Sequence, residues 1–217
     1  AARIKTLVER FEKEGEFASD DVARLLKRHL TAVSLYEEKE LAEKVAKHMD
    51  GFKLLLDHQK ENALISEKAY YMLKELSDGR DPGTTNIAAH KPGVASSVEV
   101  SDFATDFAFD GDESTRWSSA RTDNEWIYVD LQQTYLLSKV ILKWEAAYGK
   151  EYKIQVSDDA QNWKDVYTTN EGNGGVEVIT FPTETARYVR MLGMKRATSY
   201  GYSLYEFEVY QPSLYEE

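Results

Sequence analysis

Two separated segments of the sequence carry the oxygen-bearing groups that a hard cation requires. The first, 107–119 (FAFDGDESTRWSS), places Asp110 and Asp112 around a glycine, between two hydrophobic runs. The second, 204–210 (LYEFEVY), has the pattern of a terminal β-strand and carries Glu206. Because Ca²⁺ takes about six to eight oxygen ligands from carboxylates, carbonyls and water, the two segments together predict a calcium site that ties a loop to the last strand.

Two other interpretations of these residues make different demands. An EF-hand loop that began at Asp110 would need a glycine and a bidentate glutamate where the chain has Thr115 and Arg121, so the EF-hand is excluded. In the simpler interpretation, Asp110 and Asp112 only form turns and Glu206 is an exposed strand residue. The presence of both ends of the pattern favours the metal.

The other chemistry-bearing residues do not assemble a catalytic centre. The chain has no cysteine, and it shows no Ser-His-Asp order or phosphate-binding loop. His29, His48 and His58 lack a second ligand at helical spacing on the same face, so we interpret them as structural. A glycosidase places two carboxylates across a cleft; Glu99 and Glu145 could supply such a pair, but nothing else in their segments indicates a deep cleft. We therefore predict no enzyme activity.

The charge of the chain restricts its partners. The net charge is −11 over 217 residues, of which residues 1–82 carry −2 (15 Lys/Arg against 17 Asp/Glu) and residues 83–217 carry −9 (12 against 21). An acidic domain repels phosphate backbones and anionic lipids. We therefore expect neither nucleic acid nor a membrane surface as a partner, and no run approaches the roughly 18 apolar residues of a membrane helix.

The apolar spacing of the first part of the chain is helical. Helices are predicted over about 3–14, where Gly15 ends the first, then after Ser19, over about 40–59, and after Ser66. These four helices predict a small antiparallel bundle. The apolar residues expected to face inward include Leu7, Phe11, Leu25, Leu30, Leu41 and Phe52.

From residue 86 onward the apolar spacing is that of short β-strands separated by turn residues. This pattern is typical of a sandwich or jelly roll. The expected strands are 126–131, 136–144, 152–156, 165–167, 176–181, 187–191 and 204–210.

The change of period at 77–83 (SDGRDPG) divides the chain. We predict a multidomain fold in which an all-α helical bundle over 1–78 is followed by an all-β jelly-roll sandwich over 86–211. Residues 79–85 form the predicted linker and 212–217 a tail.

The helical part resembles the FIMAH domain, named after a Phe-Ile-Met-Ala-His motif and found toward the C-termini of secreted Bacillus-type enzymes. The segments that carry the resemblance are 4–11 (IKTLVERF), 29–33 (HLTAV), 48–60 (HMDGFKLLLDHQK) and 65–70 (ISEKAY). The family has no established activity, so the resemblance informs location more than chemistry.

The β part resembles the discoidin-like, coagulation factor 5/8 type C domain, over about residues 85–211. The motifs that carry this resemblance follow one another as 86–88 (NIA), 108–112 (AFDGD), 115–117 (TRW), 125–131 (EWIYVDL), 152–158 (YKIQVSD), 186–190 (ARYVR) and 205–210 (YEFEVY). Within it, 144–148 (WEAAY) and 200–204 (YGYSL) are similar to family 32 carbohydrate-binding modules of bacterial glucanases and chitosanases. The resemblance implies a discoidin-like sandwich.

In this family a structural Ca²⁺ ties the first loop to the last strand. The ligands that the resemblance implies are the carbonyls of Phe107, Asp112, Thr115 and Tyr205, the hydroxyl of Thr115, and the carboxylates of Asp110 and Glu206.

The resemblance also implies a sugar site in the loops at one end of the sandwich. An aromatic ring can stack on a sugar, and guanidinium or carboxylate groups can bridge its hydroxyls. The residues that match the ligand-facing positions of the glucan- and chitosan-binding modules are Glu99, Arg116, Glu145 and Tyr200, with Tyr148 and Tyr202 as second candidates.

Each of these assignments has a plainer alternative. Arg116 could bridge Glu99 and Glu145 as a structural ion pair, and Tyr202 could belong to the core. One departure from the chitosan-binding relatives is Arg121, which stands where they carry an acidic residue and would weaken attraction to glucosamine. The galactose-binding branch uses a loop histidine, whereas the only histidine of this domain, His90, lies near the N-terminal strand.

Together these features predict a non-catalytic carbohydrate-binding module of a larger secreted glycoside hydrolase or polysaccharide lyase. The expected ligand is a β-glucan or chitosan-type oligosaccharide, and the expected cofactor is a structural Ca²⁺. The absence of cysteine and of an initial methionine fits an excised piece of a secreted or cell-surface protein from a Gram-positive bacterium, with the catalytic domain in the same polypeptide. The alternatives are a lipid or cell-surface adhesion domain and a galactoside-binding module.

Overall fold

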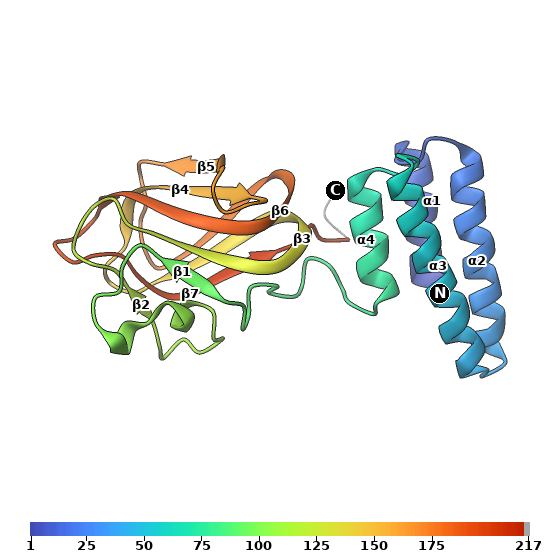
Figure 1. Cartoon of the computed structure of the whole chain (residues 1–217), viewed down its shortest axis with the longest axis horizontal. Coiled ribbons are helices and arrows are strands. Elements are labelled where there is room, and N and C mark those ends of the chain that lie inside the picture. Colours follow the sequence, from blue (N-terminus) through green and yellow to red (C-terminus); the bar gives the residue numbers. More distant parts are fainter. Residues whose placement is uncertain (215–217) are drawn as a thin grey trace. The chain divides into compact units, whose positions relative to one another are not determined.

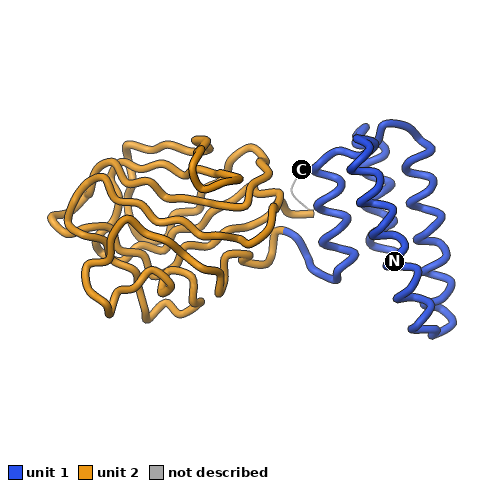
Figure 2. Tube along the Cα trace, viewed as in Figure 1, with its two compact units in different colours: residues 1–82 blue, residues 83–217 orange. Residues whose placement is uncertain are grey.

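The chain divides into two compact units, Ala1–Pro82 and Gly83–Glu217 (Figure 2). The computed structural model describes residues 1–214, so the end of the predicted tail, 215–217, lies outside the described residues. The first unit is helical and the second is a β-sandwich, which confirms the predicted fold class.

The helical unit contains the helices α1 (Ala2–Glu14), α2 (Asp20–Glu38), α3 (Ala42–Glu61) and α4 (Glu67–Ser77) (Figure 1). Gly15 ends α1 in the left-handed region, with φ 78°. Ser66 caps α4, because its hydroxyl accepts a hydrogen bond from the Ala69 amide at 3.1 Å. Ser19 occupies the cap position of α2, but its side chain makes no capping hydrogen bond.

Each helix buries one apolar face in a common core. The fully buried side chains include Val8, Phe11, Leu26, Leu30, Phe52, Leu56 and Leu73. Burial of a large apolar side chain contributes about 1.5–3 kcal/mol. The prediction that Leu25 and Leu41 face inward is wrong: they are 44% and 38% exposed, because the buried face of α2 runs through Leu26 and Leu30, and Leu41 precedes α3 as its cap residue.

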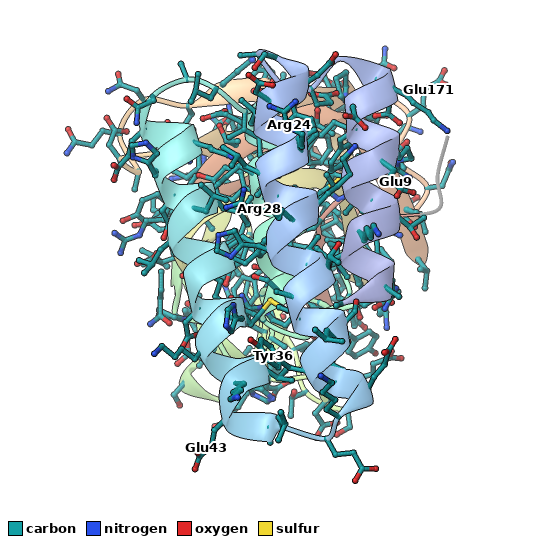
Figure 3. All side chains as sticks on the ribbon, turned by 90° about the vertical axis from the view of Figure 1, so that its right-hand side faces the viewer. Glu9, Arg24, Arg28, Tyr36, Glu43 and Glu171 are labelled. Atoms are coloured by element: carbon teal, nitrogen blue, oxygen red, sulfur yellow. The ribbon has the colours of Figure 1, made fainter. Side chains whose placement is uncertain are left out.

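The helices α1, α2 and α3 lie side by side, with α2 between the other two (Figure 3). Arg24 and Arg28, labelled on α2, are exposed. Arg24 pairs with Asp21 one turn earlier, at 2.5 Å, a surface contact of small energetic value.

The second unit is built from antiparallel strands (Figure 1). They are β1 (Gly93–Ala95), β2 (Trp117–Ser118), β3 (Trp126–Trp144), β4 (Gly149–Ser157), β5 (Lys164–Thr169), β6 (Val176–Arg196) and β7 (Ser203–Tyr210). Their order is β2-β7-β3-β6-β4-β5, and β1 pairs with β3. Two short 3₁₀ helices, η1 (Ser101–Phe103) and η2 (Thr105–Ala108), precede β2.

The strands β3 and β6 continue through positions where the sequence predicts breaks. The pairing of β3 with β6 shifts register between Asp130 and Tyr135, where Gln132 adopts a positive φ of 69°. The first half of β3 pairs with the end of β6, and its second half pairs with β7 and the beginning of β6. A bulge lets a strand bend and pass from one layer to another, so these two long strands fold the sheet over its core.

The chain turns at one end of this sandwich position the candidate site. Register pairs join Trp144 to Leu204 and Gly149 to Arg196, so the end of β3, the beginning of β4, the end of β6 and the beginning of β7 meet there. Trp117 adds β2 to the same end, because it pairs with Leu204.

Candidate functional site

A pocket of about 560 Å³ opens among the loops at this end of the sandwich. It is lined from four segments that are far apart in the sequence. The lining residues are Glu99, Phe103, Arg116, Ser118, Arg121, Glu145, Ala146, Ala147, Thr198, Ser199, Tyr200, Gly201, Tyr202 and Ser203.

Buried hydrogen bonds fix the floor of the pocket. The hydroxyls of Ser118 and Ser203 lie 2.8 Å apart, and the Ser119 amide donates to the Tyr202 carbonyl at 2.8 Å. At Gly201, a Cβ would come within 2.5 Å of the Ala120 carbonyl oxygen, so the 118–120 and 201–203 segments approach as closely as a missing side chain permits. The floor is therefore preorganised.

A buried glutamate holds the adjacent loop. Glu125, at the entry to β3, accepts hydrogen bonds from the hydroxyls of Ser96, Ser97 (2.6 Å) and Thr122 (2.5 Å). Burial alone would raise the pKa of the Glu125 carboxyl, but these three hydrogen bonds lower it below its usual value. Ser97 in turn accepts from the Ala120 amide at 2.8 Å, which links this network to the pocket floor.

The two tyrosines of the YGYSL segment have different environments. Tyr202 is fully buried, and its hydroxyl donates to the Asp123 carbonyl at 2.6 Å. Burial raises the pKa of Tyr202 above its usual range. Tyr200 is 55% exposed at the rim. Tyr202 is thus part of the core beneath the pocket, as the plainer interpretation of it held, and Tyr200 is the accessible ring.

Tyr148 does not line the pocket. Its ring packs against the core and lies beside Gly174, where a Cβ would come within 2.8 Å of the ring. The segment after β3 therefore brings Glu145, Ala146 and Ala147 to the pocket, but not Tyr148.

Arg116 lies over an aromatic ring and bridges neither carboxylate. Its guanidinium carbon is 4.0 Å from the centre of the Phe103 ring, and its Nε donates to the Ser118 hydroxyl at 3.4 Å. The ion pairs among the described residues include none between Arg116 and Glu99 or Glu145. Most of the Arg116 donors are therefore available to a ligand. The sequence interpretation missed Phe103 as the support of Arg116, because the two residues lie in separate segments and only the fold brings them together.

The partner of Glu99 is Arg121. Two Arg121 nitrogens approach one Glu99 carboxylate oxygen at 3.0 and 3.2 Å, and the Arg121 guanidinium lies 4.8 Å from the centre of the Tyr200 ring. Glu145 uses one carboxylate oxygen to accept from the Ala147 amide at 3.1 Å. The pocket thus brings together Glu99, Arg116, Glu145 and Tyr200, with Arg121 as an added member.

The predicted cation ligands converge in a second place, where the loop after η2 meets β7. The Thr115 hydroxyl donates to the Asp110 carboxylate at 2.6 Å and lies 2.9 Å from the Asp112 carbonyl oxygen. The Gly111 amide donates to the Glu206 carboxylate at 2.9 Å, with Gly111 in the left-handed region at φ 76°. Phe107 lies in η2 and Tyr205 in β7, next to these groups along the chain.

The chemistry of this donor set fits a hard cation. Glu206 is 2% exposed, and its second carboxylate oxygen is buried with no hydrogen-bond partner. Burial and the adjacent Asp110 carboxylate raise the pKa of Glu206 to about 8. An orphaned buried carboxylate oxygen is costly unless a cation satisfies it. The Asp112 carboxylate instead accepts from Ser114, and the Asp112 carbonyl is the oxygen that lies beside Thr115.

No cluster of three or more His, Cys, Asp or Glu side chains with metal-binding geometry occurs within residues 1–214. The donor set above contains only two carboxylates, so its remaining oxygens would come from carbonyls and the Thr115 hydroxyl. Within the same described residues, no helix is both long enough and apolar enough to span a membrane.

Comparisons with known proteins agree with this architecture. The family model of the F5/8 type C domain matches residues 92–207, and that of the FIMAH domain matches residues 1–79. The second unit is similar to the crystal structure of chitosan-binding module 1 of a chitosanase/glucanase from Paenibacillus sp. IK-5, with 51% identity and a TM-score of 0.57; the match covers 58% of this chain and 98% of that one.

Two further relatives point the same way. Chitosan-binding module 2 of the same enzyme, solved in complex with chitotriose, is 45% identical with a TM-score of 0.57, over 58% of this chain and 99% of that one. A polysaccharide lyase 8 family protein from Enterococcus faecalis, HylA, is 31% identical over 117 residues; the match spans 50% of this chain and 8% of the length of the lyase.

Proposed function

The chain belongs to the F5/8 type C domain family, and from this premise we propose that its second unit is a non-catalytic carbohydrate-binding module. Its ligand would be a β-glucan or chitosan-type oligosaccharide, held in the pocket at the loop end of the sandwich. The similarity to chitosan-binding modules at 45% and 51% identity supports this ligand class.

The main support for the proposal is that polar groups of Arg116 and Glu145 lack protein partners in a pocket that also exposes the Tyr200 ring. Arg116 has only one weak hydrogen bond to a protein group, and Glu145 uses one of its two carboxylate oxygens. Tyr200 also lines the pocket and is exposed. A sugar ring presents hydroxyls to charged groups and a C–H face to an aromatic ring, so this pocket offers both kinds of contact.

The same pocket is unsuited to glycoside hydrolysis. Glu99 is held by Arg121, and Glu145 is engaged with the Ala147 amide. A glycosidase needs one carboxyl group free to donate a proton and a second free to act as base or nucleophile, whereas both of these carboxylates already accept hydrogen bonds from protein groups. Binding without reaction is the role that these contacts support.

We place the module in a larger secreted polysaccharide-degrading enzyme, with the catalytic domain in the same polypeptide. The similarity to one segment of a polysaccharide lyase supports this arrangement. A shallow site of this kind binds weakly, in about the millimolar to micromolar range, and tethering it to a catalytic domain or to further modules raises the local concentration of ligand and enzyme.

A glycan array probed with the full chain and three variants tests the proposal. Arg116→Ala and Glu145→Ala should each lower binding about tenfold or more, since hydrogen bonds to a charged group contribute about 1.5–3 kcal/mol. Arg187→Ala is the matched control, because Arg187 pairs with Asp130 and does not line the pocket. If both pocket variants bind like the parent chain, the site is wrongly assigned.

We further propose a structural Ca²⁺ at the second site. Asp110 and Glu206 would supply carboxylate oxygens, Thr115 a hydroxyl and a carbonyl, and Phe107, Asp112 and Tyr205 carbonyls. The partnerless buried oxygen of Glu206 is the feature that supports a cation there. When bound, Ca²⁺ supplies the positive charge that two adjacent carboxylates need, and its role is stability because the protein oxygens fill its coordination sphere.

A further inference from the structure

The side chain of Arg121 contacts two of the groups that would recognise a ligand, the Glu99 carboxylate and the Tyr200 ring. Its guanidinium pairs with the Glu99 carboxylate at 3.0 Å and lies 4.8 Å from the centre of the Tyr200 ring. The Arg121 side chain is 59% exposed and that of Glu99 is 28% exposed. Arg121 is therefore an exposed cation that lies against a carboxylate and over one face of an aromatic ring.

Hydrogen bonds from Arg196 hold the backbone of the segment that carries Arg121. The Arg196 guanidinium donates to the Arg121 carbonyl at 2.7 Å and to the Asp123 carboxylate at 2.8 Å. The Asp123 carbonyl in turn accepts from the buried Tyr202 hydroxyl. The backbone of Arg121 is thus tied to the core, while its side chain is held only by an exposed ion pair and a ring contact, each of which contributes little.

The Arg121 side chain also changes the electrostatic environment of a ligand in the pocket. Two guanidinium groups, Arg116 and Arg121, and two carboxylates, Glu99 and Glu145, line the pocket. Because Arg121 pairs with Glu99, Glu145 is the pocket carboxylate left to attract an ammonium group, and a ligand cation would also face two guanidinium groups at close range.

We propose that Arg121 is a specificity-determining residue that makes the pocket favour rings bearing hydroxyl or carboxylate groups over rings bearing an ammonium group. The inference rests on the proposed function of the pocket and refines its ligand class. A cationic sugar has to displace Arg121 from Glu99 and Tyr200. A neutral or acidic sugar can keep Arg121 in place and use its remaining N–H donors.

Three trimers that differ only in the group at C2 of each ring, which is a protonated amine, a neutral acetamide or a hydroxyl, test this role. Isothermal titration of the full chain with chitotriose, N-acetylated chitotriose and cellotriose, at a mildly acidic pH where free amines are protonated, gives three affinities for each variant. The variants are Arg121→Ala and Arg121→Glu. Lys164→Ala is the control, because Lys164 is a similarly exposed cation (64%) paired with Glu184 on the same unit, and it does not line the pocket.

Arg121→Ala should raise the affinity for chitotriose about tenfold, the combined size of an exposed ion pair and an exposed cation–π contact. The affinities for the two neutral trimers should change less than about threefold, and Arg121→Glu should widen the difference. The gain should shrink as salt is added, because exposed charges are screened. Thermal unfolding midpoints close to that of the parent chain would show that the variants fold.

Two results overturn the inference. If Arg121→Ala changes all three affinities by the same factor, or changes none, Arg121 does not select by charge, although carbohydrate binding still stands. If the parent chain and the variants bind no trimer at millimolar concentration, the proposed function fails, and the specificity inference fails with it.

Discussion

Tyr200 is 55% exposed at the pocket and would be the ring that stacks on a bound sugar, whereas Tyr202 is buried in the core. We predict that Tyr200→Ala lowers oligosaccharide affinity about two- to tenfold, because aromatic stacking contributes about 0.5–1.5 kcal/mol beyond buried area. Tyr200→Phe keeps the ring and should bind within about twofold of the parent chain. Titration calorimetry measures both; equal affinities for the alanine variant and the parent would remove Tyr200 from the site.

Glu125 makes the loop under the pocket sensitive to acid. The pKa of its carboxyl is lowered from about 4.5, because hydrogen bonds from Ser96, Ser97 and Thr122 outweigh the burial that would raise it. A carboxyl with a lowered pKa stabilises the fold above the unfolded-state pKa, and this contribution is lost as the pH falls through the folded-state value.

We therefore expect Glu125→Gln to lower the free energy of unfolding at pH 7 by about 1–3 kcal/mol, and the difference from the parent chain to shrink as the pH falls well below 4.5. Denaturant titrations followed by tryptophan fluorescence report this unit alone, because all four tryptophans lie in it. Glu184→Gln, which removes an exposed ion pair with Lys164, is the control. A pH-independent difference for Glu125→Gln would contradict the account.

At the scale of elements, the close packing of β6 against Tyr202 fixes the pocket floor. A Cβ added at Gly193 would lie 2.3 Å from the Tyr202 ring, and the Gly193 amide donates to the Glu125 carbonyl at 2.7 Å. Gly193→Ala should destabilise the β unit by about 1–3 kcal/mol, the usual cost of overpacking a core, seen as a lower midpoint of tryptophan fluorescence in denaturant.

Gly51 in α3 offers the opposite case. A Cβ there meets only the His29 ring, at an ordinary contact distance of 3.6 Å. Because alanine is a better helix former than glycine by about 0.5–1 kcal/mol, Gly51→Ala should leave unchanged or raise the stability that far-UV circular dichroism measures for the helices. A large loss of stability in Gly51→Ala, or no loss in Gly193→Ala, would contradict the packing around these two glycines.

The elements also show what could be predicted from the sequence. Helical spacing and Gly15 give the first helix almost to the residue, and alternating apolar positions give most strands. The strands β1 and β2 are too short, at three and two residues, for any periodicity to reveal them. The sequence predicts separate strands over 126–131 and 136–144, whereas β3 bends between them and continues, since it pairs with β6 on both sides of the register shift.

The candidate site shows the same limit. Arg116, Glu99 and Glu145 are charged residues that can bind sugar hydroxyls, and the family resemblance assigns them to the loops at one end of the sandwich. The pairing of these side chains depends on the directions in which they point, and the spacing of residues along the sequence does not reveal those directions. Thus Glu99 pairs with Arg121 rather than Arg116, and Arg116 lies on Phe103.

At the scale of the whole molecule, the proposed Ca²⁺ would link an early loop to the last strand of the β unit. Exhaustive chelation should lower the thermal midpoint of the tryptophan transition by several degrees, since a ligand at 100 times its dissociation constant stabilises by about 2.7 kcal/mol. The thermal midpoint of the helical unit, measured by far-UV circular dichroism, should change far less. In Glu206→Gln the chelator should have little further effect; an unchanged midpoint for the parent chain under exhaustive chelation would refute the site.

The central claim is that the loops at one end of the sandwich bind an oligosaccharide without altering it. An ¹H–¹⁵N NMR titration of the full chain with cellotriose tests it most directly, because each amide reports its own surroundings. We expect concentration-dependent shifts confined to the segments 99–103, 116–121, 145–147 and 198–203, with the trimer recovered intact. Shifts that cluster elsewhere, no shift at saturating trimer, or cleavage of the trimer would contradict it.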